Sequence, residues 1–280
     1  MTSRPEPSEP YQAGPGIHVL PLRTPTLPPA TRTNCVVVDA EESGEVYVID
    51  PASPWPDPRD ELDAWLADRQ LTVRAILLTH HHHDHVGGAA YLAEATDAPV
   101  WAHPVTEGLV DIPIARTLEE GDVVGGRLTA LFTPGHAPGH LAFADSVSGL
   151  IIAGDMVAGT GSIVVAPPEG HMGTYLASLR RLKDEAPKGM IPAHGPLIED
   201  PQDHLDGYIE HRLWREERIY EGLPDDGREA ALMDVTRAAY TDVPETLHML
   251  AACSARAHLD HLVELGRAVQ GEGSDAWRRS

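Results

Sequence analysis

A short, uninterrupted apolar run at residues 75–79 (AILLT) restricts the fold of this chain more than any other feature. Such a run is typical of a strand buried on both faces of a sheet. It leads directly into HHHHDHVGG, where His80 and His82 can point to the same side of an extended backbone. With Asp84 and His85, four groups that borderline divalent metals accept as ligands stand within six residues. The sequence therefore predicts half of a two-metal site at the end of a buried strand.

Consecutive histidines also occur in affinity tags, and histidines can gather by chance on a surface or in a core. The internal position of this run, between an apolar strand and a Gly-rich turn, argues against a tag. Three remote strand ends argue against chance, because each offers one more ligand in a turn: His136, Asp155 and His194. We expect these side chains to converge on the histidine cluster.

Up to about residue 200, the chain mixes short strands with helices. Strands are expected where apolar or β-branched residues run between Gly, Pro and Ser turns, at residues 36–39, 45–50, 99–103, 127–136, 141–145 and 149–155. Residues 57–70 are expected to form a helix, because an Asp-Pro pair starts the segment and its apolar residues recur at helical spacing. This mixture predicts an α/β sandwich with helices covering the sheets.

The two ends of the chain differ from this central part. Residues 1–16 carry Pro, Glu and Ser without an apolar core, so they are predicted to be a disordered tail rather than a signal peptide. From about residue 203 the sequence is dominated by helices and closes with a Gly-Glu-Gly turn that predicts a β-hairpin wing. We therefore predict a tail at 1–16, a catalytic domain at 17–200 and a small helical domain at 201–280.

Composition limits the classes of partner. No apolar run approaches the roughly 18 residues that a membrane-spanning helix needs, and we expect a cytoplasmic protein that does not bind membranes. The formal net charge of -22 repels polyanions and disfavours nucleic acid as a partner. The only cysteines, Cys35 and Cys253, lack metal-ligand spacing and are expected to be incidental thiols.

The histidine cluster and the three remote ligands together resemble the metallo-β-lactamase superfamily, whose pattern is His-x-His-x-Asp-His followed by spaced His, Asp and His. The resemblance runs from about residue 17 to residue 198. It implies an αββα sandwich with two metals at one edge. One metal would be held by His80, His82 and His136, the other by Asp84, His85 and His194, and Asp155 would bridge both.

The resemblance also implies a chemistry. A metal-bridging hydroxide attacks an acyl or phosphoryl centre without a protein nucleophile, and Asp84 and Asp155 are the expected catalytic residues. Asp50 matches an early aspartate of the family that supports a ligand from behind, and His140 stands where the family has a second histidine or polar group. We expect two divalent ions, with zinc preferred, although iron and manganese accept the same ligands.

The C-terminal sequence is similar to the β-lactamase-like protein 2 group, whose members append a small winged-helix domain. The resemblance implies several activities, of which hydrolysis of an ester or thioester of a small or carrier-bound acyl group is the leading hypothesis. Single-stranded RNA cleavage is the alternative, followed by β-lactamase activity and by a non-enzymatic metal-binding module for nucleic acid. Acidic residues intersperse the arginines after residue 203, so we expect the appended domain to cover the active-site edge or form a homodimer contact rather than bind RNA.

Overall fold

The structure is a computed structural model that describes residues 5–280. The chain divides into two compact units, and each is considered on its own. The first comprises residues 1–134, 138–163 and 182–202, and the second comprises residues 135–137, 164–181 and 203–280. The predicted domain limits at residues 17, 200 and 201 stay a prediction.

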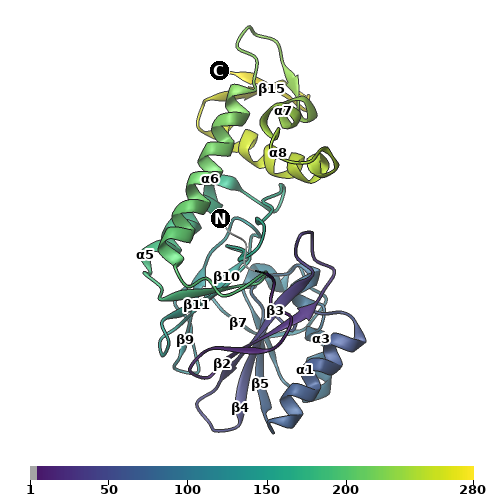
Figure 1. Cartoon of the computed structure of the whole chain (residues 1–280), viewed down its shortest axis with the longest axis vertical. Helices are drawn as coiled ribbons and strands as arrows, with labels where there is room; N and C mark the ends of the chain where they lie inside the picture. The colour runs from purple at the N-terminus through teal and green to yellow at the C-terminus, as the bar shows by residue number, and fades with distance from the viewer. Residues whose placement is uncertain (1–4) are drawn as a thin grey trace. The chain divides into compact units, whose positions relative to one another are not determined.

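The first unit contains two β-sheets (Figure 1). Seven strands form the first sheet in sequence order: β1 Tyr11–Gly14, β2 Ile17–Arg23, β3 Arg32–Asp39, β4 Glu45–Ile49, β5 Thr72–Leu77, β6 Val100–Ala102 and β7 Ile114–Thr117. The second sheet has the order β12-β11-β10-β9-β8, built from β8 Val123–Val124, β9 Leu128–Phe132, β10 Leu141–Asp145, β11 Leu150–Gly154 and β12 Gly189–Pro192. Strands β4 to β7 run parallel, as do β11 and β12.

Alternation along the strands of the first sheet creates two cores. One face, with Val36 and Ile49, packs against Phe143 and Ile152 of the second sheet. The other face is covered by α1 (Pro56–Asp68) and α3 (Ala89–Thr96) (Figure 1). Apolar residues of these two helices and of this face form the second buried cluster. Short helices α2 (His83–Val86) and α4 (Pro104–Glu107) lie in the connections. The predicted α/β sandwich and its buried central strand are therefore confirmed.

The predicted disordered tail is wrong for part of its length. Residues Tyr11–Gly14 form β1, which pairs antiparallel with β2. Glu6 also contacts the chain, because its carboxylate accepts hydrogen bonds from the backbone N–H groups of Thr31 and Arg32. Pairing with a neighbouring strand overrides the low strand propensity of this Gly-containing segment. Residues 1–4 of the predicted tail lie outside the described residues.

The second unit contains the C-terminal helices and a small sheet. Its helices are α5 (Met172–Asp184), α6 (Pro201–Glu221), α7 (Leu232–Ala239) and α8 (His248–Glu264), with a 3-10 turn at Glu245–Leu247. The part of α5 up to Arg181 and the part of α6 from Asp203 belong to this unit. Strands β13 (Ala230–Ala231), β14 (Ala268–Gln270) and β15 (Ala276–Arg279) pair in the order β13-β15-β14, so the predicted wing is present. Trp277 is fully buried against Ile219, Val235 and Leu259 and organises the core of this unit.

Within residues 5–280, no helix combines the length and the apolar character needed to cross a membrane.

Candidate metal centre

The predicted ligands stand in loops that follow buried strands. The segment from His80 to His85 follows β5 and enters the short helix α2, Asp155 follows β11, and His194 follows β12. These strand ends are fixed by the sheets, which limits how far the ligands can move. Close backbone packing tightens the first loop further, since a Cβ on Gly88 would lie only 2.4 Å from the Pro51 carbonyl oxygen.

One group of potential ligands lies entirely within the first unit: Asp84, His85 and His194, with Asp155 in contact with both histidines. Asp155 Oδ1 is 3.5 Å from His85 Nε2 and 3.3 Å from His194 Nε2. Asp84 Oδ2 is 3.6 Å from His194 Nε2. A tetrahedral ion bound at about 2.0–2.2 Å separates its ligand atoms by about 3.3–3.6 Å. The spacing therefore fits a single divalent cation.

Hydrogen bonds behind this group fix which ring nitrogen faces it. His85 Nδ1 donates to Asp50 Oδ2 at 2.8 Å, and His194 Nδ1 donates to the Arg32 carbonyl at 2.9 Å. Because a carboxylate and a carbonyl can only accept, both Nδ1 atoms carry a proton, and Nε2 is the atom of each ring that faces the group and could bind a metal in place of a proton. Within the described part of the chain, His85 Nε2 is buried and makes no hydrogen bond. A buried nitrogen in this state suits a metal ligand.

Charges in the group favour a cation. Burial alone would raise the pKa of Asp155, but the neighbouring His194 and His85 hold it well below the usual range. Burial would likewise lower the pKa of His85, but Asp155 and Asp50 raise it well above the usual value. Asp155 therefore stays ionised, and positive charge beside it is stabilised.

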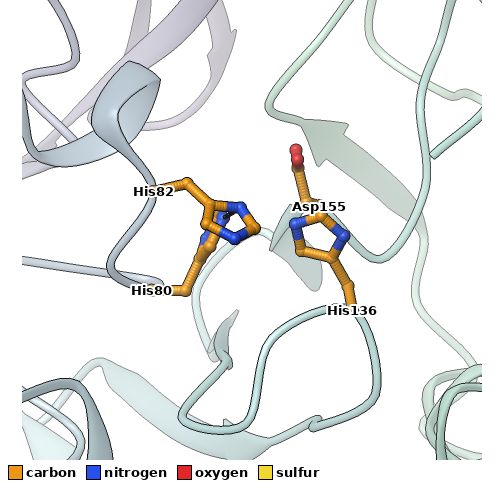
Figure 2. Close-up of side chains that lie close together, drawn as sticks. All are labelled: His80, His82, His136 and Asp155. Atoms are coloured by element: carbon orange, nitrogen blue, oxygen red, sulfur yellow. Dashed lines mark hydrogen bonds between the residues drawn. The ribbon is translucent and has the colours of Figure 1, made fainter. Parts of the chain in front are cut away.

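The remaining predicted ligands form a second group. Potential ligand atoms of His80, His82, His136 and Asp155 all lie within 4.8 Å of one another, and Figure 2 shows these side chains close together. His80 Nε2 and His82 Nδ1 are 2.9 Å apart. His136 Nδ1 donates to the Val164 carbonyl at 2.8 Å, which leaves its Nε2 as the ligand atom. The seven predicted ligands thus lie in two groups that could each hold an ion, and their assignment as ligands stays a prediction.

Asp50 and His140 contact the groups from behind. Asp50 accepts hydrogen bonds from Thr79 as well as from His85, and its side chain is almost fully buried. The backbone N–H of Asp155 donates to His140 Nε2 at 3.0 Å, so the proton of His140 is on Nδ1 and faces the hydroxyl of Thr133 at 2.9 Å. Each residue orients a predicted ligand and belongs to neither group.

Several supporting residues were missed by the sequence reasoning. The Arg32 and Val164 carbonyls orient His194 and His136, and a backbone carbonyl carries no residue-type signal. Asn34 is buried in β3 and donates to the carbonyls of Pro192 and Gly195, on either side of His194. The sign of this role in the sequence was that the polar residue Asn34 directly precedes the apolar run of residues 35–38. Thr79 links Asp50 to His80, and the sequence indicated only that it ends the apolar strand.

Comparison with known proteins agrees with this architecture. The family model described as "Metallo-beta-lactamase superfamily" matches residues 28–109 and 106–194, and "Beta-lactamase associated winged helix domain" matches residues 231–277. A Beta-lactamase-like protein 2 homolog from Drosophila melanogaster is 31% identical over 227 residues, covering 75% of each chain. An atrochrysone carboxyl ACP thioesterase from Cryptosporiopsis sp. (strain 8999) is 28% identical over 197 residues, covering 68% of this chain and 58% of the thioesterase.

Solved structures are similar as well. A metallo-beta-lactamase family protein from Thermus thermophilus superposes with a TM-score of 0.79 at 25% identity, covering 95% of this chain and 99% of the other. The protein TTHA1623 in a di-iron-bound form has a TM-score of 0.55 at 33% identity, covering 66% of this chain and 96% of the other. Fold and site define a metal-dependent hydrolase. The chain belongs to the metallo-beta-lactamase superfamily and carries the associated winged-helix domain.

Proposed function

We propose that this chain uses two divalent metal ions, preferably zinc, to hydrolyse an ester or thioester of a small or carrier-bound acyl group. The observation that supports the metal centre is the 3.3–3.6 Å spacing that links Asp84 to His194, and His194 and His85 to Asp155. The acyl substrate is supported by the thioesterase among the relatives and by the net charge of -22, which opposes binding of RNA. A cytoplasmic location and a homodimer stay predictions.

The residues present divide the work of such a reaction. Bound metal ions would activate water as a nucleophile and stabilise the negative charge that develops on the acyl oxygen. Asp84 is the most accessible member of its group, with 18% of its side chain exposed against 0% for His85, so it is placed to orient the attacking water. Asp155 is ionised and anchored through its backbone to His140, which fits a ligand shared by both groups.

Metal identity follows availability as much as ligand preference. Imidazole and carboxylate suit zinc, and they also suit iron and manganese. Elemental analysis of the full-chain protein as purified identifies the metal, and reconstitution of the metal-free protein with Zn²⁺, Fe²⁺ or Mn²⁺ identifies the active one. Activity with iron alone would refute zinc and leave the hydrolase proposal intact.

Substrate class is tested by one screen of the metal-replete protein. Its arms are an acyl thioester, the matched oxygen ester, a β-lactam and unstructured single-stranded RNA. We expect turnover of the thioester or ester, and RNA cleavage that exceeds it would overturn the acyl proposal in favour of a phosphodiesterase.

A matched pair of variants ties turnover to the site. His82→Ala removes one predicted ligand, so we expect at least about a 100-fold loss of activity and a fall from two bound metals to about one. His83→Ala removes the exposed neighbouring histidine and should keep both properties. Full activity and metal content in His82→Ala would refute the ligand assignment.

A further inference from the structure

The turn that carries His136 depends on a segment far along the chain. His136 Nδ1 donates to the Val164 carbonyl at 2.8 Å. The backbone N–H of His171 donates to the carbonyl of Gly135 at the same distance. Two hydrogen bonds therefore tie the residue before the ligand, and the ligand ring itself, to residues 164–171.

The turn is also pressed against α5. Gly135 has φ of +127°, and a Cβ at this position would lie 2.3 Å from the backbone nitrogen of Tyr175. Such an approach requires glycine, because any side chain would collide with backbone. Tyr175 is fully buried, and the Arg212 guanidinium carbon lies 5.4 Å from the centre of its ring. The turn that carries His136 therefore packs against Tyr175 of α5, which in turn contacts Arg212 of α6.

Residues 164–171 form neither helix nor strand, and they are held in place by the fully buried Val165 and by contacts at the ends of the segment. His171 holds the C-terminal end of this segment in place. Its Nδ1 accepts a hydrogen bond from the backbone N–H of Thr174 at 3.1 Å, which caps the first turn of α5. Its Nε2 then carries the proton and donates to Glu264 Oε1 of α8 at 2.7 Å.

A second contact holds the first turn of α5 on α8. A Cβ on Gly173 would lie 3.0 Å from the His261 ring, so the two helices are in close contact at this point. His261 Nδ1 in turn lies 2.7 Å from the buried carboxylate of Glu216 on α6. Residues 164–171 are therefore attached to the C-terminal helices through both a side-chain pair and helix packing.

We infer that the C-terminal helices position His136, with His171 as the positioning residue that transmits their hold through residues 164–171. This inference rests on the proposed function, because it concerns a ligand of the proposed metal centre. It assigns the appended domain a role in building the metal site, separate from any binding of substrate or nucleic acid.

Cobalt titration of the full-chain, metal-free protein tests the inference, because Co²⁺ reports both affinity and ligand set through its visible spectrum. His171→Ala removes the cap of α5 and the pair with Glu264. We expect one of the two binding events to weaken by about tenfold, with a changed cobalt spectrum, while the other keeps its affinity. His171→Asn retains an acceptor for the Thr174 N–H but not the pair with Glu264, so it should recover only part of the lost affinity.

Two controls make the result decisive. His211→Ala removes an exposed histidine of the same unit and should leave both events unchanged. If His171→Ala does not fold, Glu264→Ala replaces it, since 51% of that side chain is exposed, and a two- to fivefold weakening of the same event is expected. Wild-type affinity and spectrum in the folded variant would overturn the inference, as would equal weakening of both events. Failure of the wild-type protein itself to bind two ions would instead refute the proposed function.

Discussion

The buried carboxylate of Asp50 accepts three hydrogen bonds behind the candidate site. Its Oδ1 accepts from the backbone N–H of Thr79 at 2.8 Å. Its Oδ2 accepts from the Thr79 hydroxyl at 2.6 Å and from His85 Nδ1 at 2.8 Å. Asp50→Asn keeps the size of the side chain but replaces one acceptor oxygen with a donor, so at least one of these three donors must lose its partner.

The size of the effect depends on how the amide turns. If the amide nitrogen replaces Oδ1, the Thr79 N–H is buried without an acceptor, at a cost of about 1–3 kcal/mol of stability. If it replaces Oδ2, it favours the other tautomer of His85, with the proton on Nε2. That proton would occupy the atom that faces Asp155, and metal affinity of the group should fall by about 10–100-fold.

Either orientation gives a measurable loss. Urea unfolding of the metal-free full chain reports the first, and titration of Co²⁺ or Zn²⁺ reports the second. Asp39→Asn is the matched control, because Asp39 is an exposed aspartate at the end of the adjacent strand β3. An Asp50→Asn protein with both the urea midpoint and the metal affinity of the wild type would show that Asp50 does not hold His85.

Two further predictions concern stability. Burial lowers the pKa of His258 to about 4, whereas an unfolded histidine titrates near 6.5. The stability that depends on neutral His258 is therefore complete above pH 6.5 and is lost as the pH falls toward 4, by about 1.4 kcal/mol at pH 5.5. In urea unfolding, the change in stability from pH 8 to pH 5.5 should be less favourable in the wild type than in His258→Gln by about 1.4 kcal/mol; equal changes in the two proteins would contradict this. Gly88→Ala forces a Cβ to 2.4 Å from a backbone oxygen, so we expect a loss of about 1–3 kcal/mol in the same assay. Gly108→Ala, where the nearest atom is 3.6 Å away, should be close to neutral, and an equal effect of both changes would exclude the steric explanation.

The candidate ligands could be found in the sequence because their signal is local and chemical. The apolar run before His80 indicates a buried strand, and β5 places the cluster at the end of that strand. His136, Asp155 and His194 each stand in a turn after an apolar segment, where a polar side chain without a core role is conspicuous. The structure brings all of them into the two groups.

Features that depend on tertiary pairing could not be predicted in the same way. The strand β1 lies in a Pro- and Gly-containing segment whose composition indicates a tail, and it forms because β2 offers a free edge. Support of His136 by residues 164–171 was equally hidden, since it runs through the carbonyls of Val164 and Gly135. Neither contact depends on which side chain stands there.

Three histidines of the site show why support by a side chain can be found in a sequence and support by a backbone carbonyl cannot. His85 is oriented by the side chain of Asp50, whereas His194 and His136 are oriented by the carbonyls of Arg32 and Val164. A substitution at Asp50 removes the acceptor, but a substitution at Arg32 or Val164 keeps it. Sequence patterns can therefore expose only the first kind of support. The other two are set by where the backbone runs, so a change that displaces residues 164–171 should disturb His136 more than any substitution of Val164 itself.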